Sequence, residues 1–318
     1  MNTLTDPTTR TAISVSGLRK TYGNKVVLDG VDLSIGEGEV FALLGPNGAG
    51  KTTIVRILST LIPADAGTAT VMGHNLSAQA GAVRGVIGVT GQFSAVDELL
   101  TGEENLLLMG RLRRLPAAER RARTTELLER FDLVDAARQT PATYSGGMKR
   151  RLDLAMTLMG RPRLIFLDEP TTGLDPRSRQ TMWQIIRELV SEGVTILLTT
   201  QYLEEADYLA DRIAMLDHGR IVAEGTPEEL KRRMPGAHIR LLFADAASLE
   251  KAARALGDST RDDAELVLRV PNERGTRSLR EVLARLGDDV AVEDLSIHTP
   301  DLDDVFFAVT GNASKEKS

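Results

Sequence analysis

The chain has 318 residues, with 39 Lys and Arg against 45 Asp and Glu, a net charge of −6 and no Cys. This length predicts one large or two modest domains with a buried core, and the lack of Cys excludes disulfides, zinc–thiolate sites, iron–sulfur centres and thiol catalysis. The negative charge argues against a nucleic-acid partner, which favours a basic surface. No signal peptide is recognisable, and no segment approaches the roughly 20 apolar residues that span a bilayer, so we expect a chain that does not cross a membrane by itself.

Apolar patterns predict strands and helices in alternation. Residues 13–18 and 26–35 alternate apolar and polar side chains on either side of Gly23-Asn24, which predicts two strands with a turn between them. Continuous apolar runs, typical of strands buried on both faces, follow at residues 40–44, 164–167 and 194–198. Helical patterns such as residues 179–191 separate these runs, and this order predicts an α/β fold with parallel strands.

Two changes of pattern divide the chain further. Residues 95–159 are rich in Leu, Arg, Glu and Ala, with apolar residues three and four apart, which predicts a helical subdomain. A short charged helix then leads to Pro235-Gly236, a dipeptide typical of linkers, and strand and helix patterns repeat on a small scale beyond it. The expected parts are a flexible N-terminus (1–11), a first domain (12–235), a C-terminal α+β accessory or regulatory domain (237–311) and a disordered tail (312–318).

Charge is unevenly distributed along the chain. Residues 1–236 carry 28 positive and 29 negative side chains, whereas residues 237–318 carry 11 and 16, which supports two separate units. Six arginines lie close together in the helical region, namely Arg111, Arg113, Arg114, Arg120, Arg121 and Arg123. We interpret them as a solvated helical face relieved by Glu119 and Glu126, with anionic lipid or an acidic partner helix as the alternative.

A phosphate-binding loop is the strongest motif. The segment that begins at Gly45 fits the pattern G-x-x-x-x-G-K-[ST] between an apolar strand and a helical pattern. Its glycines let successive N–H groups point at phosphate oxygens, and the following helix adds its positive N-terminal dipole. Lys51 can reach the β- and γ-phosphates, and the Thr52 hydroxyl can bind Mg²⁺. The residues expected to bind ATP here are Gly45, Pro46, Asn47, Gly48, Ala49, Gly50, Lys51, Thr52 and Thr53.

Two carboxylates follow the apolar run at residues 164–167. Asp168 and Glu169 therefore lie at the carboxyl end of a buried strand, and open α/β sheets bind ligands at that edge. Asp168 can complete the shell of a Mg²⁺ ion, and Glu169 can orient or deprotonate an attacking water. We predict that Glu169 is the main catalytic carboxylate, assisted by Lys51.

Further motifs resemble the ATP-binding subunits of ABC transporters. Tyr144-Ser145-Gly146-Gly147-Met148, about 20 residues before Asp168, is similar to the signature motif of that family, and the resemblance extends over residues 12–230. It implies a P-loop ABC ATPase domain, with a mixed sheet core and a helical subdomain, which binds ATP and Mg²⁺. Ser145, Gly146 and Gly147 would then cap ATP held by a second copy of the chain.

The resemblance assigns three more residues. Tyr22 occupies the place of an aromatic that stacks on adenine, and Gln92 follows a strand at residues 86–89 like the glutamine that senses the γ-phosphate, binds the metal ion and faces the membrane partner. Asp175 belongs to the loop between subunits. Within the family the sequence motifs most resemble those of daunorubicin-resistance-type drug exporters, which share Thr90-Gly91-Gln92 and the C-terminal segment from Leu302 to Gly311.

One position departs from the common family pattern. Gln201 stands where most ABC ATPases place a histidine that contacts the γ-phosphate. Glutamine can donate a hydrogen bond to a phosphate oxygen but does not change its charge near neutral pH. We therefore expect Gln201 to position the γ-phosphate without a protonation role.

One motif set in one chain implies half of each of two ATP sites. We expect a homodimer, closed head to tail by ATP, that energises an integral membrane permease on another chain at the cytoplasmic face of the cell membrane. The expected cargo is a drug or antibiotic-like compound, with a lipid or polysaccharide as the alternative. A soluble ABC ATPase acting on ribosomes or DNA, or a nucleotide-binding regulator without turnover, are less favoured functions because the chain has one motif set, no Cys, and both Asp168 and Glu169.

Overall fold

A computed structural model describes residues 10–92, 95–232, 237–272, 276–287, 290–298 and 300–313. They form two compact units, Met1–Pro227 and Glu228–Ser318. The division falls at the start of the short charged helix, between Pro227 and Glu228, whereas the sequence analysis placed the whole helix in the first domain. The Pro235-Gly236 linker, most of the expected N-terminal segment and most of the expected tail lie outside the described residues.

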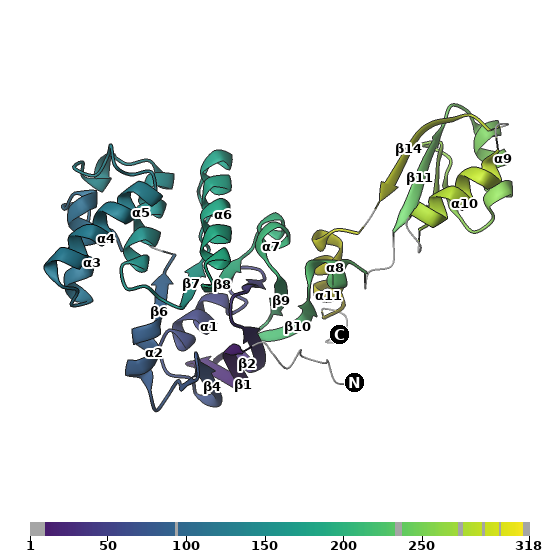
Figure 1. Cartoon of the computed structure of the whole chain (residues 1–318). Coiled ribbons are helices and arrows are strands. Elements are labelled where there is room, and N and C mark those ends of the chain that lie inside the picture. Colours follow the sequence, from purple (N-terminus) through teal and green to yellow (C-terminus); the bar gives the residue numbers. More distant parts are fainter. Residues whose placement is uncertain are drawn as a thin grey trace. The chain divides into compact units, whose positions relative to one another are not determined.

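The first unit contains two sheets (Figure 1). Its strands are β1 (Thr11–Tyr22), β2 (Lys25–Gly36), β3 (Val40–Leu44), β4 (Ala66–Val71), β5 (His74–Asn75), β6 (Ile87–Thr90), β7 (Leu164–Asp168), β8 (Thr195–Thr200), β9 (Arg212–Asp217) and β10 (Arg220–Gly225). Its helices are α1 (Lys51–Leu58), α2 (Ala80–Val86), α3 (Gly102–Leu112), α4 (Ala117–Arg130), η1 (Pro141–Thr143), α5 (Gly146–Leu158), α6 (Pro176–Ser191) and α7 (Leu203–Leu209). Helix α8 (Pro227–Arg232) begins at the division.

The larger sheet has the order β10-β9-β3-β8-β7-β6. Strands β9, β3, β8, β7 and β6 are parallel, and only β10 is antiparallel to its neighbour β9. Every residue of β3, β7 and β8 is buried, which explains their continuous apolar sequences. The expected strands at residues 40–44 and 164–167 are thereby confirmed, and the strand expected at 194–198 is present but runs from Thr195 to Thr200. The strand expected at residues 86–89 begins one residue later, because Val86 ends α2.

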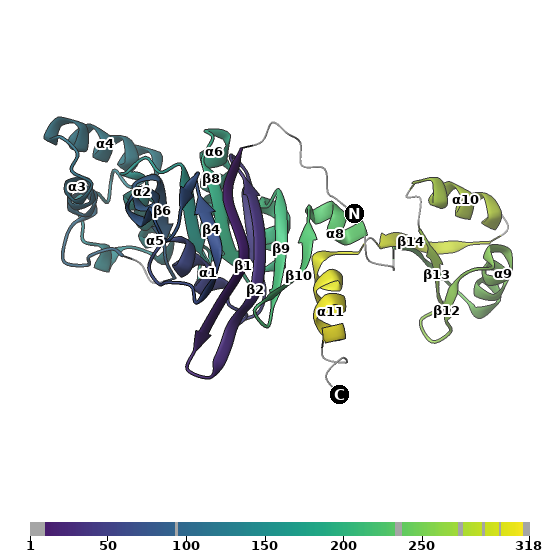
Figure 2. The ribbon, with the colours of Figure 1, turned by 90° about the horizontal axis from the view of Figure 1, so that it is seen from below.

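The smaller sheet, with the order β2-β1-β4-β5, is antiparallel. Strands β1 and β2 form the predicted pair, joined at Gly23, whose φ of 57° lies in the left-handed region that favours glycine. Helix α1 packs between this sheet and the larger one. Ile54 and Ile57 lie in one hydrophobic cluster with Ile13 of β1 and Phe41 of β3. Figure 2 shows α1 beside β1 and β2.

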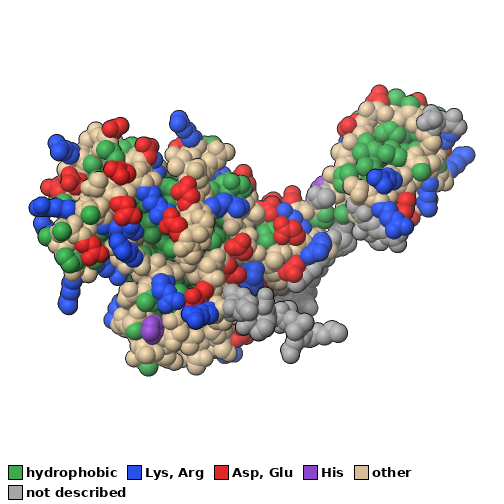
Figure 3. Space-filling model, in the orientation of Figure 1, with side chains coloured by type: hydrophobic (Ala, Val, Ile, Leu, Met, Phe, Trp, Pro, Cys, Tyr) green, Lys and Arg blue, Asp and Glu red, His purple; other side chains and the backbone are tan. Residues whose placement is uncertain are grey.

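Helices α3 to α5 form a separate helical region beside β6 and β7 (Figure 1). Helix α3 begins at a capping box in which Thr101 and Glu104 bond each other's backbone N–H. The arginine cluster of this region is only partly a solvated face. Arg123 pairs with Glu126 as expected, but Arg113 and Arg120 donate to backbone carbonyls. On the face drawn in Figure 3, basic and acidic side chains are interspersed over these helices.

The second unit is a small α+β structure. Its elements after α8 are β11 (His238–Phe243), α9 (Ala246–Leu256), β12 (Thr260–Asp262), β13 (Val267–Pro271), α10 (Thr276–Leu286), β14 (Val292–His298) and α11 (Leu302–Ala313). The sheet has the order β12-β13-β11-β14, and residues of α9 and α10 share its core. The sequence pattern predicts strands at residues 239–243, 266–270 and 290–297 and helices at 247–256, 279–286 and 302–309, and each overlaps an element of the structure, whereas β12 is additional. Among the described residues of both units, no helix has the length and apolar character needed to cross a bilayer.

Candidate active site

The parallel strands of the larger sheet bring four predicted segments to one edge. The phosphate-binding loop follows β3, Gln92 follows β6, the carboxylates end β7 and Gln201 follows β8. Because these strands run in the same direction, their carboxyl ends meet at one edge of the sheet, where ligands bind in open α/β folds. The sheet thus brings together residues of the phosphate-binding loop and carboxylates that lie more than 100 residues apart in the sequence.

A pocket of about 390 Å³ lies at this edge. Its lining residues come from the β1–β2 turn, the phosphate-binding loop and the ends of β6 and β7, and they are Tyr22, Lys25, Val27, Asn47, Gly48, Gly50, Lys51, Thr52, Thr53, Gln92 and Glu169. Nine of these residues were predicted to bind ATP or to act on it. Lys25 and Val27 are additions that no motif indicated.

The phosphate-binding loop is shaped by tight packing. A Cβ on Gly45 would lie 2.2 Å from the carbonyl oxygen of Leu216, so only glycine fits where the chain leaves β3. Gly48 and Gly50 have φ of 82° and 115°, in the left-handed region that favours glycine. Gly50 is also the N-cap of α1, which leaves the N-terminus of that helix at the pocket. These are the features of a site for phosphate oxygens.

Lys51 is held in the centre of the loop. Its side chain is only 4% exposed, and its Nζ donates to the carbonyl oxygens of Gly45 at 2.6 Å and Pro46 at 3.1 Å. The Glu169 carboxylate, 8% exposed, lies 3.6 Å from the same nitrogen. Burial lowers the pKa of Lys51, and the Glu169 charge opposes this shift. A phosphate group would offer the ammonium a second counter-charge, so the loop fits a nucleoside triphosphate.

Asp168 is buried beneath the pocket. Its Oδ1 accepts from the Thr199 hydroxyl at 2.6 Å and from the Thr52 hydroxyl at 3.2 Å. The Thr52–Asp168 contact joins two residues predicted to bind Mg²⁺. Among the described residues, no group of three or more His, Cys, Asp or Glu could hold a metal ion. A single carboxylate and a hydroxyl suit Mg²⁺, which takes its other ligands from water and phosphates.

The backbone at Glu169 is unusual. Its φ of 51° lies in the left-handed region, which is strained for a residue with a Cβ. Its N–H donates to both the carbonyl and the hydroxyl oxygen of Thr199, at 3.1 and 3.0 Å. The Thr172 hydroxyl donates to Oε2 at 3.3 Å. Thr199 therefore holds the Asp168 carboxylate and the backbone of Glu169. The sequence analysis missed this role, although a polar residue near the end of an apolar strand signals it.

The signature residues lie outside this pocket. Ser145 and Gly147 line a second pocket of about 280 Å³ at the N-terminus of α5. Ser145 caps the helix, its hydroxyl accepting from the Met148 N–H at 3.2 Å. A Cβ on Gly147 would lie 2.5 Å from the Ser178 hydroxyl oxygen, which explains the glycine, whereas a Cβ on Gly146 would meet nothing closer than 3.8 Å.

Asp175 and Gln201 complete the set of predicted residues. Asp175 caps α6, accepting from the N–H and hydroxyl of Ser178 at 3.0 and 2.6 Å, and these bonds lower the pKa of Asp175. It therefore lies near the signature pocket through Ser178. Gln201 is half-buried and is not among the residues that line the larger pocket. Gly45, Pro46 and Ala49 shape the loop without lining the pocket.

A glycine-rich loop at a helix N-terminus, a buried lysine and two strand-end carboxylates define a P-loop nucleoside triphosphatase. A family model described as "ABC transporter" matches residues 28–172. The chain is 49% identical over 310 residues to daunorubicin resistance ATP-binding protein DrrA2 of Streptomyces coeruleorubidus, covering 96% of each chain. It is 48% identical to the daunorubicin/doxorubicin resistance ATP-binding protein DrrA of Streptomyces peucetius, covering 96% of this chain and 94% of that protein.

Other relatives extend the comparison. A Nod factor export ATP-binding protein I of Sinorhizobium fredii is 37% identical, covering 99% of this chain and 90% of that protein. A solved ATP-binding subunit of an ABC transporter matches 70% of this chain and 92% of its own, with 31% identity and a TM-score of 0.63. A dimeric ATP-binding cassette bound to ADP and Pi matches 67% and 98%, with 28% identity and a TM-score of 0.62.

These similarities establish the family. The chain belongs to the ATP-binding subunits of ABC transporters, as the motifs indicated, and it is an ATPase that couples ATP hydrolysis to transport. The expected α/β fold, with a mixed sheet core and a helical subdomain, is confirmed for the first unit.

Proposed function

We propose that this chain is the ATPase subunit of an exporter for a drug or antibiotic-like compound. The near-full-length similarity to proteins named for daunorubicin and doxorubicin resistance supports this cargo class. The chain would work on the cytoplasmic face of the cell membrane, bound to a permease encoded on another chain. The Nod factor export relative, at lower identity, supports a carbohydrate- or lipid-like cargo as the second candidate.

The observation that carries the mechanism is the separation of two pockets. The phosphate loop and carboxylates form one pocket, and Ser145 and Gly147 form another. A second copy, arranged head to tail, would bring its α5 N-terminus to the ATP held by the first copy. Each ATP would then lie between the phosphate-binding loop of one copy and the N-terminus of α5 of the other, and both features bind phosphate groups. This division of one site over two chains, together with the dimeric state of a solved relative, supports a homodimer.

In the proposed cycle, Tyr22 stacks on adenine and the loop from Gly45 to Thr53 holds the phosphates. Mg²⁺ would be held by Thr52, Asp168 and Gln92, where it would neutralise the charge of the β- and γ-phosphates. Glu169 would orient and deprotonate the attacking water, and Gln201 would position the γ-phosphate. Product release would reopen the dimer, and Gln92 would transmit the change to the permease.

Transport in vesicles tests the proposed cargo. The full chain is co-expressed with the multi-span membrane protein encoded beside it, and ATP-dependent uptake of daunorubicin into inside-out vesicles is measured. Lys51→Ala serves as the control because it removes the phosphate-binding ammonium. We expect uptake that requires both chains and is lost with Lys51→Ala. Daunorubicin-independent ATPase activity together with export of a glycolipid by the same pair would contradict the drug assignment and favour the second candidate.

A further inference from the structure

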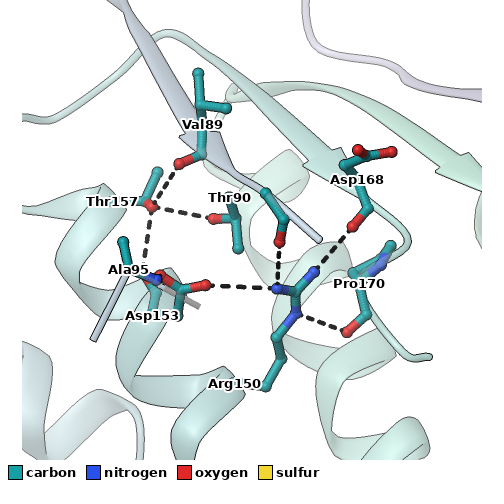
Figure 4. A network of polar contacts seen from close by, with 9 residues as sticks. Val89, Thr90, Ala95, Arg150, Asp153, Thr157, Asp168 and Pro170 are labelled. Atoms are coloured by element: carbon teal, nitrogen blue, oxygen red, sulfur yellow. Dashed lines mark hydrogen bonds and ion pairs between the residues drawn. The ribbon is translucent and has the colours of Figure 1, made fainter. Parts of the chain in front are cut away.

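One arginine connects the signature helix α5 to both halves of the catalytic edge (Figure 4). The guanidinium of Arg150 donates from Nη1 to the carbonyl of Gly91 at 2.7 Å, from Nη2 to that of Asp168 at 3.2 Å and from Nε to that of Pro170 at 2.9 Å. The three carbonyls belong to two segments that are far apart in the chain, the one at Gly91 and the one from Asp168 to Pro170. None of the catalytic or binding roles described above involves this side chain.

The guanidinium is buried and oriented. The Arg150 side chain is 11% exposed, and the Asp153 carboxylate, one helical turn away on α5, lies 3.4 Å from Nη1. Asp153 is itself buried and accepts from the Ala95 N–H at 3.3 Å. Arg150 therefore has a fixed counter-charge on one side and three backbone acceptors on the other, which is an arrangement that a planar fork of donors can satisfy.

A second contact ties the same helix to the same strand. The Thr157 hydroxyl bonds the Thr90 hydroxyl at 3.0 Å, at the end of β6, and lies 3.4 Å from the carbonyl oxygen of Val89. A Cβ on Gly88 would lie 2.4 Å from the Thr157 methyl group, so α5 packs directly on β6. Because Thr90 and Gly91 immediately precede Gln92, helix α5 holds the start of the Gln92 segment at two points.

We propose that Arg150 is a positioning residue that fixes Gln92 and the backbone of Asp168 to the first turns of α5. Ser145 caps this helix only five residues before Arg150, within two helical turns. The N-terminus offered to the ATP of a second copy is therefore connected through one guanidinium to the residues that face the chain's own γ-phosphate and metal ion. This inference rests on the proposed function, since it assigns to Arg150 the coupling between the two half-sites.

Arg150→Lys is the first test. Lysine keeps the charge and its contact with Asp153 but presents its donors from one nitrogen, which cannot satisfy three separate carbonyls. We expect kcat for ATP hydrolysis by the full chain to fall about 10- to 100-fold, the effect of displacing catalytic groups by about 1 Å. The Kd for ATP should stay within about twofold of the wild-type value, since the substitution does not alter the phosphate-binding loop. Wild-type kcat would overturn the inference.

A double-mutant cycle separates positioning from general damage to the fold. If Arg150 acts through Gln92, Arg150→Lys should lower kcat by less than about threefold in a Gln92→Ala background, because coupled residues are not additive. Independent effects that multiply would overturn the inference. Unchanged hydrolysis in Gln92→Ala alone would instead contradict the proposed function, which makes the two failures distinguishable.

One further measurement does not depend on turnover. Amide hydrogen exchange of a peptide over residues 87–92 should be about tenfold faster in Arg150→Lys without nucleotide, because the Gly91 carbonyl loses its donor. Arg130→Lys is the matched control, since Arg130 pairs with Glu192 away from either pocket, and it should change neither exchange nor kcat.

A double variant without either buried charge tests the inference if the single variant does not fold. Arg150→Gln combined with Asp153→Asn removes both buried charges together and so leaves no unpaired ion. If Arg150→Lys fails to fold, this pair should still show the loss of kcat with ATP binding retained, and wild-type hydrolysis by the pair would overturn the inference.

Discussion

Glu169→Gln tests the electrostatics of the candidate active site. The substitution keeps the shape of the side chain and a carbonyl oxygen for the Thr172 hydroxyl, but it removes the negative charge 3.6 Å from the Lys51 ammonium. Both side chains are less than a tenth exposed, so solvent screens this pair weakly. The variant leaves a buried cation with the Gly45 and Pro46 carbonyls as hydrogen-bond partners and the Asp168 charge as a remaining counter-charge.

The size of the effect follows from these contacts. Breaking one partner of a buried ion pair costs about 3–5 kcal/mol, and the bare attraction near 4 Å is about 4 kcal/mol at an effective dielectric constant of about 20. Two carbonyls still accept from Lys51, and the carboxylate no longer has to be buried, so we expect a net loss of about 1–3 kcal/mol. A unit of this size then melts several degrees lower, at about 2–4 °C per kcal/mol.

ATP should reverse this loss. The phosphates would supply the negative charge that Lys51 lacks in the variant, and they would no longer face the Glu169 carboxylate. We therefore expect ATP to raise the melting temperature more in Glu169→Gln than in the wild type, while the hydrolysis rate falls about 10²- to 10⁴-fold, the usual contribution of a general base.

The assay combines thermal unfolding, with and without ATP and Mg²⁺, and single-turnover hydrolysis. Glu224→Gln is the matched control, because Glu224 is part-buried and pairs with Arg212 away from the pocket. It should alter stability without changing the ATP-induced shift. Equal ATP shifts in Glu169→Gln and wild type, or full hydrolysis by Glu169→Gln, would refute the reasoning.

Three other substitutions probe the remaining parts. Burial raises the pKa of Glu205, so its contribution to stability is present below the ordinary pKa of 4.5 and is lost as the pH rises through the folded-state value. In Glu205→Gln, the free energy of unfolding in urea, measured from pH 4 to 8, should therefore decrease less with rising pH than in the wild type. Gly147→Ala places a Cβ 2.5 Å from the Ser178 hydroxyl oxygen and should abolish ATP-dependent dimerisation in light scattering, with ATP binding retained. Tyr22→Ala should weaken ATP binding about 5- to 150-fold in calorimetry, the equivalent of about 1–3 kcal/mol for a base stacked on an aromatic ring.

The sequence determined the segments of the candidate site because their chemistry is local. A phosphate-binding loop needs glycines and a lysine at fixed spacing, and strand ends deliver carboxylates directly after apolar runs, so Lys51, Asp168 and Glu169 could be predicted from neighbours in the chain. The buried strands β3, β7 and β8 were predictable for the same reason, since burial on both faces leaves a continuous apolar sequence.

Shorter and more exposed elements were not predicted. Strands β4, β5 and β12 carry mainly exposed residues, so little hydrophobic pattern marks them. Strands β9 and β10 and helices α2 and α7 were also missed. β9 has an apolar centre, but it could not be ordered in the sheet without knowing that it pairs with β3. The pairing of strands, and which of them lie at the edge of a sheet, depends on tertiary contacts that cannot be read from sequence patterns.

Only the tertiary structure decided which residues hold the site together. Arg150 stands in a basic run that resembles any exposed helical face, and its three acceptors are backbone carbonyls, which have no sequence signature. Thr199 likewise acts through Asp168 and the Glu169 backbone from a neighbouring strand. Sequence motifs identify the groups that would contact the nucleotide. The groups that position them, Arg150 on α5 and Thr199 on β8, depend on how α5 packs on the sheet and on which strands are neighbours in it.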